Sequence, residues 1–370
     1  MRSGLTMPPC GGMLEAEYVF GYKGERPMAG KRVTLAAVAK ATGYTVNTIS
    51  RALRDCSDIA PATRRHIQDV AGRMGYVRNM AASSLRLGRS NSIAFIAGYV
   101  VNPFFGMLFE YVSRAAAAYG WNVIFLSPNE DEPSELAAIQ SAYARGVDGV
   151  VLMPTQKSDR ARVLLEACRL PYVLLMRDFP GYEDDCLLCD EEQAGYAAAM
   201  HLLEKGHRRL SYVCDGGCVH NIVERRDGFL RAAKEHGVEV TVIPSLRADG
   251  QSDAVDQAEA IARLRREEGL SGVGVFCDMQ ARHVIAQLRR HRIRVPEDVA
   301  FVGFDNIDGV SPSPLPICSV GSDYQSMCRQ VVDLLHRRIE GDSSPAQTVV
   351  FPAEINCRES CAATENGWQL

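Results

Sequence analysis

The stretch TLAAVAKATGYTVNTISRAL, residues 34–53, contains two short runs of helical periodicity separated by a tight turn. Thr34 and Thr45 each stand directly before one run, where a side-chain oxygen can accept a hydrogen bond from an amide of the first helical turn. Gly43 falls between the runs, where a turn is needed. The apolar side chains of the second run recur at helical spacing, at Val46, Ile49 and Leu53. The pattern predicts two capped helices joined by a tight turn.

A third helix is predicted from Pro61 to about Met74. Proline suits the first helical position, and Gly75 follows as a stop signal. Ala60 stands at the capping position without a side-chain acceptor, which loses about 1 kcal/mol of helix stability. Residues 34–78 are therefore expected to form a small three-helix unit.

The charge of this part differs from that of the rest of the chain. Residues 31–89 contain 11 Lys or Arg against 3 Asp, whereas the whole chain of 370 residues has a formal net charge of −4. A compact basic segment fused to an acidic body is typical of a protein that binds a polyanion. A basic surface that is merely solvated would give the same count, so charge alone leaves that alternative open.

Two capped helices across a tight turn, inside a basic segment, predict a helix-turn-helix. The second helix of this motif reads bases in the major groove with its N-terminal residues. We expect Asn47 to bond a base edge, most readily adenine, and Arg51 to reach a guanine or a phosphate. Val46 is expected to make an apolar contact with a base. Polar contacts, to bases or to the DNA backbone, are expected at Thr34, Thr45, Thr48 and Ser50. A three-helix module that binds protein is the alternative.

From residue 91 onward, short apolar runs rich in β-forming residues alternate with amphipathic helical segments. The runs lie at 92–98, 122–128, 149–154, 172–177, 210–215, 272–276 and 299–304. Nearly continuous apolar strands separated by helices predict parallel sheets covered on both faces. The length of this region predicts two α/β lobes, with a ligand beyond the carboxyl ends of the strands.

Several protein classes are disfavoured. No apolar run approaches the roughly 20 residues that span a bilayer, and no secretory signal opens the chain, so we expect a cytoplasmic protein. The 12 cysteines are scattered, mostly in apolar runs. Cys186 and Cys189 with Cys214 and Cys218 have a spacing that zinc can use, but Cys189 and Cys214 fall in or beside expected strands, so we expect no metal and no cofactor. The absence of Walker, GxGxxG and GxSxG motifs argues against an enzyme.

Longer motifs occur in a fixed order along the chain. They are VTLAAVAKATGYTVNTISRAL at 33–53, GYVRNMAASSLRLGRS at 75–90, NPFF at 102–105, RGVDGVVLMP at 145–154, DEEQAGYAAAMHLLEKGHRRLSYV at 190–213, ERRDGF at 224–229 and VPEDVAFVGFDN at 295–306. On these motifs the chain resembles the lactose/galactose repressor family of transcriptional regulators, from residue 33 to about 358. The resemblance implies a body like that of periplasmic sugar-binding proteins, a dimer on a palindromic operator, and a small effector such as a sugar, a sugar acid or a nucleobase.

The resemblance also implies roles for single residues. In the family the hinge folds on operator DNA, with Leu85 as a minor-groove wedge and Asn79 and Ala82 facing the backbone and groove. Capping of the head's own core is the alternative role of Leu85. The implied effector contacts are aromatic and charged, at Phe104, Phe105, Arg225, Asp278 and Asp305. Either phenylalanine can instead simply cover the sheet, and Arg177 and Asp190 match family positions where a structural role is at least as plausible.

Two departures from the family pattern bear on these roles. Arg78 replaces the usual proline before the hinge, and Cys277 replaces the usual asparagine before Asp278, so the effector chemistry can differ. The predicted division is a disordered extension at 1–32, a head at 33–79, a hinge at 80–90, a two-lobed body at 91–358 and a tail at 359–370. The chief rival function is a periplasmic-type sugar-binding receptor, and the basic head argues against it.

Overall fold

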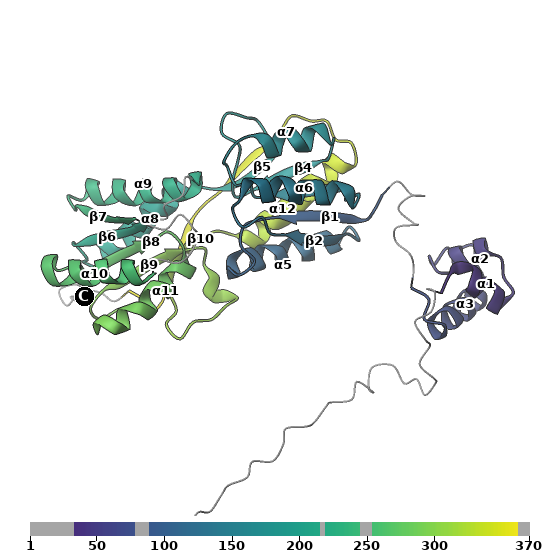
Figure 1. Ribbon diagram of the computed structural model, residues 1–370, viewed down its shortest axis with the longest axis horizontal. Helices are drawn as coiled ribbons and strands as arrows, with labels where there is room; N and C mark the ends of the chain where they lie inside the picture. Colours follow the sequence, from purple (N-terminus) through teal and green to yellow (C-terminus); the bar gives the residue numbers. More distant parts are fainter. Residues whose placement is uncertain (1–32, 78–88, 215–218, 245–253, 362–370) are drawn as a thin grey trace, which may run out of the picture. The chain divides into compact units, whose positions relative to one another are not determined.

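The computed structural model describes residues 33–77, 89–214, 219–244 and 254–361 of the chain (Figure 1). The chain divides into two compact units, one within residues 1–80 and the other within residues 81–370. The first unit contains the three-helix head, and the second contains the two-lobed body. No described helix is both long enough and apolar enough to cross a membrane.

The head consists of α1 (Leu35–Thr42), α2 (Val46–Ala52) and α3 (Pro61–Arg73). The Thr34 hydroxyl accepts a hydrogen bond from the Ala37 amide, and the Thr45 hydroxyl accepts one from the Thr48 amide, so both predicted caps are confirmed. Ala60 gives α3 no side-chain cap, as its methyl group dictates. The head core contains five buried apolar residues, Val38, Ile49, Ala52, Ile67 and Ala71.

The body contains two six-stranded sheets, one in each lobe. The first-lobe sheet has the order β11-β5-β4-β3-β1-β2, and the second-lobe sheet has the order β12-β10-β9-β8-β6-β7. The first-lobe strands are β1 (Ser92–Ile96), β2 (Asn122–Leu126), β3 (Gly149–Leu152), β4 (Tyr172–Leu175), β5 (Cys186–Cys189) and β11 (Thr348–Phe351). The second-lobe strands are β6 (Leu210–Cys214), β7 (Val240–Pro244), β8 (Gly272–Val275), β9 (Ala300–Phe304), β10 (Cys318–Gly321) and β12 (Glu354–Asn356).

Helices cover both faces of each sheet, as the apolar strands require (Figure 1). The first lobe has α5 (Pro103–Ala117), α6 (Glu132–Ala144), α7 (Arg160–Ala167) and α12 (Tyr324–Ile339). The second lobe has α8 (Glu191–Glu204), α9 (His220–Glu235), α10 (Ala254–Glu268), α11 (Asp278–Leu288) and two short 3-10 turns, η1 (Arg289–His291) and η2 (Ile307–Gly309). Strand pairing is parallel throughout, except that β12 runs antiparallel to β10. The predicted fold class is confirmed.

The chain passes between the lobes three times. It leaves the first lobe after β5, returns after β10, and enters the second lobe again after β11. Each sheet therefore takes one edge strand from the last part of the chain, β11 in the first lobe and β12 in the second. Ser360, which we placed in a tail, packs in the second lobe, where its hydroxyl donates to the Phe301 carbonyl at 2.7 Å.

Candidate functional site

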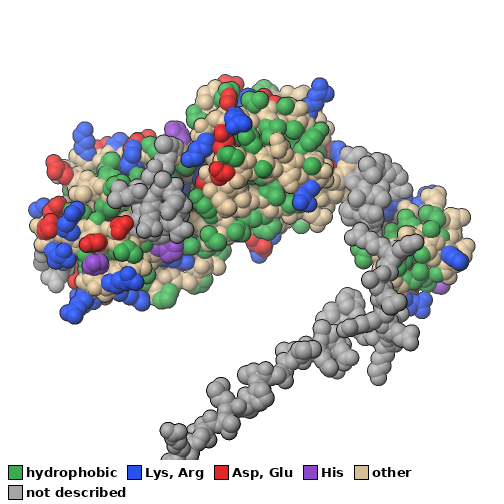
Figure 2. Space-filling view, in the orientation of Figure 1, with side chains coloured by type: hydrophobic (Ala, Val, Ile, Leu, Met, Phe, Trp, Pro, Cys, Tyr) green, Lys and Arg blue, Asp and Glu red, His purple; other side chains and the backbone are tan. Residues whose placement is uncertain are grey.

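The first turn of α2 is the exposed surface of the head that matches the predicted DNA contacts. Thr45, Val46 and Asn47 are exposed, with 46% of Val46 accessible, and Thr48 is half-buried. The two threonine hydroxyls lie 2.9 Å apart and share a hydrogen bond, which fixes their side chains at the helix start. Lys and Arg side chains stand out from the head surface in the view of Figure 2. This turn is therefore free to enter a groove.

Other predicted DNA contacts are placed differently. Arg51 is half-exposed and forms an ion pair with Asp58 in the following loop, so DNA must compete with that carboxylate. Ser50 is only 9% exposed, because it lies with Ile49 and Ala52 on the buried side of α2. This burial favours a packing role for Ser50 over the predicted phosphate contact. The hinge positions Arg78, Asn79, Ala82 and Leu85 lie outside the described residues.

In the second lobe, a buried charge network surrounds Arg225 of α9. Its Nε and Nη2 donate to the two carboxylate oxygens of Glu191 at 2.6 and 2.9 Å. Its Nη1 donates to Asp305 Oδ1 and to the Phe276 carbonyl, both at 3.1 Å. The guanidinium also lies over the Phe304 ring, 5.0 Å from its centroid. The bidentate contact with Glu191 fixes the plane of the guanidinium at the carboxyl ends of β8 and β9.

Burial and the neighbouring charges shift the pKa values of the residues in this network. Removal from water disfavours the charged form of Arg225, but Glu191 and Asp305 outweigh that effect and raise the pKa of Arg225 well above its ordinary value. Burial raises the pKa of the Asp305 carboxyl, and Arg225 opposes the shift only in part. The two carboxyl groups around one guanidinium present oxygen acceptors, which favours hydroxyl or amine donors as additional partners.

Two glycines allow the helices that carry the network to approach each other closely. A Cβ atom at Gly195 of α8 would lie 1.9 Å from the Arg225 carbonyl oxygen, and one at Gly228 of α9 would lie 1.9 Å from the Glu192 carbonyl oxygen. Only a hydrogen fits in either place. The backbones of α8 and α9 therefore touch, and this contact sets Arg225 beside Glu191.

Several non-glycine residues with positive φ follow the strands at this end of both sheets. They are Glu130 after β2, Gln156 after β3, Met176 after β4, and Asp305 and Asn306 after β9, with φ of 56°, 58°, 64°, 93° and 53°. Such conformations cost of order 1–3 kcal/mol and gather at binding sites. In open α/β sheets this end of the strands is also where ligands bind.

The carboxyl ends of the two sheets are in contact. The side-chain oxygen of Gln156, after β3 in the first lobe, accepts a hydrogen bond of 2.9 Å from the His220 amide at the start of α9. Ile307 of η2 packs in the apolar cluster that contains Phe104 and Phe105 of α5. Residues from both lobes thus meet near the Arg225 network.

The predicted effector residues are not equally placed. Phe104 and Phe105 are each 5% exposed and pack edge to face on one another. Asp278 is fully enclosed, and its Oδ2 accepts from the Ser319 hydroxyl at 2.8 Å and the Ile307 amide at 3.1 Å. These contacts hold η2 against β10, which favours a structural role for Asp278 over the predicted effector contact. Arg225 and Asp305 are each 4% exposed and bond directly to each other.

Three further residues of this region were not predicted. Glu191 is the main partner of Arg225, Glu130 binds Arg177 at 2.7 and 3.1 Å, and Gln156 joins the lobes. Glu191 lies in the DEEQAGY motif, directly after Asp190, which caps α8 through the Gln193 amide. An acidic residue in a first helical turn is common for electrostatic reasons alone, so its buried role gives no separate sequence signal.

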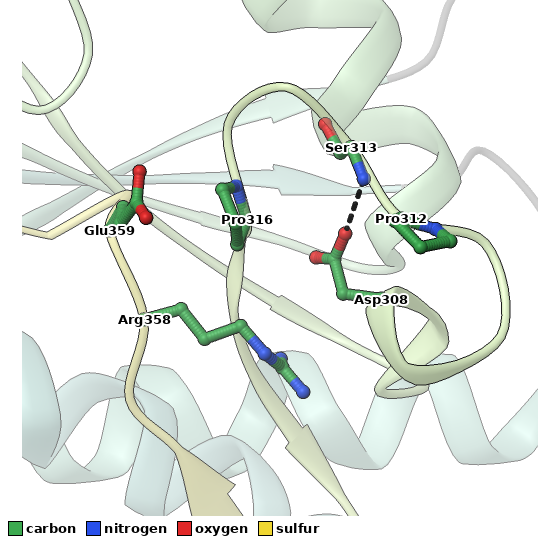
Figure 3. Close-up of a pocket in the computed structure, with 6 residues that line it drawn as sticks. All are labelled: Asp308, Pro312, Ser313, Pro316, Arg358 and Glu359. Carbon is green, nitrogen blue, oxygen red and sulfur yellow. Dashed lines mark hydrogen bonds between the residues drawn. The ribbon is translucent and has the colours of Figure 1, made fainter.

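A surface hollow lies beside the loop that follows η2 (Figure 3). Asp308 in this hollow accepts from the Ser313 amide at 3.1 Å and the Ile317 amide at 2.8 Å, and pairs with Arg282 at 2.7 Å. The opposite wall is formed by Arg358 and Glu359. The polar groups of Asp308 are used to hold the loop, so the hollow does not offer this carboxylate to a ligand.

Known proteins resemble this chain over both the head and the body. The model of a periplasmic binding protein-like domain matches residues 199–361. The HTH-type transcriptional regulator DegA of Bacillus subtilis is 27% identical over 89% of this chain and 98% of its own length.

Two solved structures extend the comparison. The transcriptional regulator CelR in complex with cellobiose is 25% identical, with a TM-score of 0.63, over 89% of this chain and all of that chain. The Lac repressor dimer bound to operator and the anti-inducer ONPF has a TM-score of 0.73 at 18% identity, over 90% of this chain and all of that chain. The likeness therefore covers the head as well as the two lobes.

Proposed function

We propose that the chain is a helix-turn-helix transcriptional regulator of the lactose/galactose repressor family, that it binds a palindromic operator as a dimer, and that a small effector controls this binding. The observation that carries the proposal is the exposed, capped first turn of α2 in the same chain as a two-lobed body with a buried charge network. We further propose repression of transcription as the outcome, in the cytoplasm, where the DNA lies.

The DNA interface that we propose is centred on Asn47. Its side chain can bond an adenine edge, while Val46 offers apolar contact and Thr45 and Thr48 approach the backbone. Arg51 joins this set when DNA replaces its partner Asp58. One head covers one half-site, so a palindrome requires a two-fold symmetric protein. The hinge roles of Asn79, Ala82 and Leu85 rest on the family resemblance alone.

The effector site that we propose lies between the lobes, around Arg225 and Asp305. A guanidinium and a carboxylate held 3.1 Å apart can together bond neighbouring hydroxyl groups. Such hydroxyl groups accept a hydrogen bond from the guanidinium and donate one to the carboxylate. Phe104 and Phe105 border the same contact between the lobes, and a sugar presents an apolar face to such rings. A sugar is therefore the favoured class, as in the CelR–cellobiose complex. An effector shifts DNA affinity only by its differential affinity for the two states of the body.

The test begins with a thermal-shift screen of sugars, sugar acids and nucleobases on the purified chain. A ligand at 100 times its dissociation constant adds about 2.7 kcal/mol of stability. Affinity for duplex fragments from the region upstream of the gene is then measured with and without the hit. Salt is held constant, because phosphate contacts make affinity salt-dependent.

Two variants connect the response to the proposed site. Asp305→Asn preserves the shape of the side chain and removes its charge, so operator affinity should stop changing with the effector. Asp227→Asn, an exposed position on α9, is the matched control and should respond as the unaltered chain does. Failure of the chain to prefer any operator over random DNA would refute the proposed function. A normal response in Asp305→Asn would refute only the placement of the effector site.

A further inference from the structure

Four residues with metal-binding side chains meet at one point of the second lobe. They are His201 in the last turn of α8, Cys318 at the start of β10, Cys357 just after β12, and Cys361. One ligand atom from each residue lies within 4.8 Å of every other. His201, Cys318 and Cys361 are buried, whereas Cys357 is exposed and leaves the cluster open to solvent on one side.

In this Cys₃His cluster, the sulfur and nitrogen atoms of His201, Cys318 and Cys361 lie within hydrogen-bonding distance of one another or of a backbone amide. His201 Nε2 lies 2.9 Å from Cys361 Sγ, and Cys318 Sγ lies 2.8 Å from Cys361 Sγ. The Arg358 amide donates a hydrogen bond of 2.9 Å to Cys318 Sγ. Amide donors of this kind support metal-bound thiolates from outside the ligand set. A disulfide needs a sulfur–sulfur distance of about 2.0 Å, so Cys318 and Cys361 are free thiols in this arrangement.

Three thiols and one imidazole are the donor set of a tetrahedral zinc site. With Zn–S bonds of about 2.3 Å and Zn–N bonds of about 2.0 Å, ligand atoms stand roughly 3.3–3.8 Å apart around the ion. In the cluster the two shortest separations are 2.8 and 2.9 Å and no pair of ligand atoms is more than 4.8 Å apart, so shifts of about 1 Å bring all four to the spacing of a bound ion. We propose that His201, Cys318, Cys357 and Cys361 bind one Zn²⁺ ion in tetrahedral geometry.

The proposed site is structural, because four protein ligands leave no position open for a substrate or an activated water. Its ligands come from α8, β10 and the final described segment, which carries β12. The ion would thus fasten this segment, and with it the edge strand of the second-lobe sheet, to the lobe interior. Arg358, between two of the ligands, also bonds the side chain of Asn306, next to Asp305.

The site revises our expectation that the chain binds no metal. Among the described residues, the cysteines that we considered earlier are not brought together in a metal-binding group: Cys186 Sγ contacts the Arg177 carbonyl and Cys189 Sγ contacts Met176 Sδ. Cys218 lies outside the described residues. The four residues of the Cys₃His cluster come from three segments far apart in the sequence. Only the fold brings them together.

The test uses the full chain purified under reducing conditions without chelator. Elemental analysis should find one zinc per chain. Replacement by Co²⁺ should give the intense visible absorption of a tetrahedral cobalt ion together with thiolate-to-cobalt charge transfer in the near ultraviolet. Because Cys357 is exposed, Cys357→Ser should fold and should lose the stoichiometric zinc. Cys168→Ser, at a half-buried cysteine of the first lobe, is the matched control and should retain it.

Thermal unfolding gives a second measurement. Added Zn²⁺ should raise the melting temperature of a chelator-treated chain and of Cys168→Ser, and should leave that of Cys357→Ser unchanged. The proposal is overturned if the reduced chain takes up no stoichiometric zinc. A Cys318–Cys361 disulfide in the freshly purified chain, or equal zinc affinity in Cys357→Ser and the control, overturns it as well.

Discussion

Asn47 separates base reading from general attraction to DNA. Its side chain is uncharged and exposed on the first turn of α2, so its contribution to DNA binding must come from hydrogen bonds rather than charge. We predict that Asn47→Ala weakens operator binding by roughly 1–3 kcal/mol and relaxes preference at one base pair. His66→Ala, exposed on α3, is the control. An equal loss on random DNA, measured at one salt concentration, would assign Asn47 to the backbone instead.

Asp278 and Asp305 allow a second test of single residues. Burial raises the pKa of Asp278 well above its ordinary value, and the nearby Asp305 raises it further. The folded chain therefore holds this proton more tightly than the unfolded chain does. The stability that this carboxyl contributes is present below its unfolded pKa, about 3.9, and is lost as pH rises through its folded pKa.

Asp278→Asn cannot ionise and should lack that loss. We predict that the urea midpoint of the variant gains on that of the unaltered chain between acidic and neutral pH. The new amide has no assigned acceptor, which costs about 1–3 kcal/mol at every pH, so the pH dependence is the quantity to compare. Effector response should persist in Asp278→Asn, in contrast to Asp305→Asn. A constant difference between the two chains across pH would contradict the assignment.

At the scale of single residues, the sequence predicts the chemical role of a side chain better than it predicts whether that side chain is buried. Thr34 and Thr45 are correctly predicted as caps because a cap depends on its neighbours in the chain. Ser50 and Asp278 have the right chemistry for contacts outside the fold, but tertiary packing encloses both. Glu191 finds Arg225 only because α8 and α9 cross, and no local pattern records that crossing.

The crossing of α8 and α9 is an element-scale feature with a sharp requirement. We predict that Gly195→Ala or Gly228→Ala separates the helices, because a backbone oxygen already lies 1.9 Å from the position of the new carbon. The Arg225–Glu191 contact would then lengthen, and effector response would be reduced while the head remained folded. Gly106→Ala in α5, where nothing lies within 4 Å, is the control and should be neutral or stabilising by up to about 1 kcal/mol. Unchanged effector affinity in both glycine variants would show that the close crossing is dispensable.

The uncapped start of α3 predicts a stabilising change. Ala60 has φ −51° and ψ 135°, a geometry in which a serine hydroxyl can reach the amides of the first turn. We predict that Ala60→Ser stabilises the head by about 1 kcal/mol. Hydrogen exchange of α3 amides in the full chain should slow accordingly. Ala60→Val, which adds bulk without an acceptor, should not slow it, and equal protection in the two variants would exclude capping as the cause.

The elements that the sequence reveals are those with strong local patterns. Seven apolar runs correspond to β1, β2, β3, β4, β6, β8 and β9, and the three head helices have the predicted bounds within a residue or two. Five strands are not predicted: β5, β7, β10, β11 and β12. Three of these lie at sheet edges, where exposure interrupts the apolar pattern, as in the partly exposed β7 and β11. β5 is flanked by Asp184, Asp185 and Asp190, and β10 contains Ser319 and Gly321, so neither strand is part of a longer apolar run.

At the scale of the whole molecule, residues 1–27 are predicted to be dispensable. They show no helical or strand periodicity and balance 3 basic against 3 acidic residues, so they offer neither a core nor a charge for DNA. A chain that starts at Met28 should keep both operator affinity and effector response. Band-shift titrations of the two chains at equal salt measure this. Weaker operator binding by the shorter chain would identify a functional arm.

The three passages between the lobes also determine which parts of the chain can fold first during synthesis. A ribosome completes the three helices of the head by Arg73, but neither lobe can close its sheet until β11 and β12 emerge, from Thr348 to Asn356. Domains near the N-terminus generally fold first during synthesis. A chain broken off after α12 would therefore carry a finished head, while the edges of β5 and β10 would be open to strands of other chains. Translation errors late in the message would accordingly yield aggregation-prone chains.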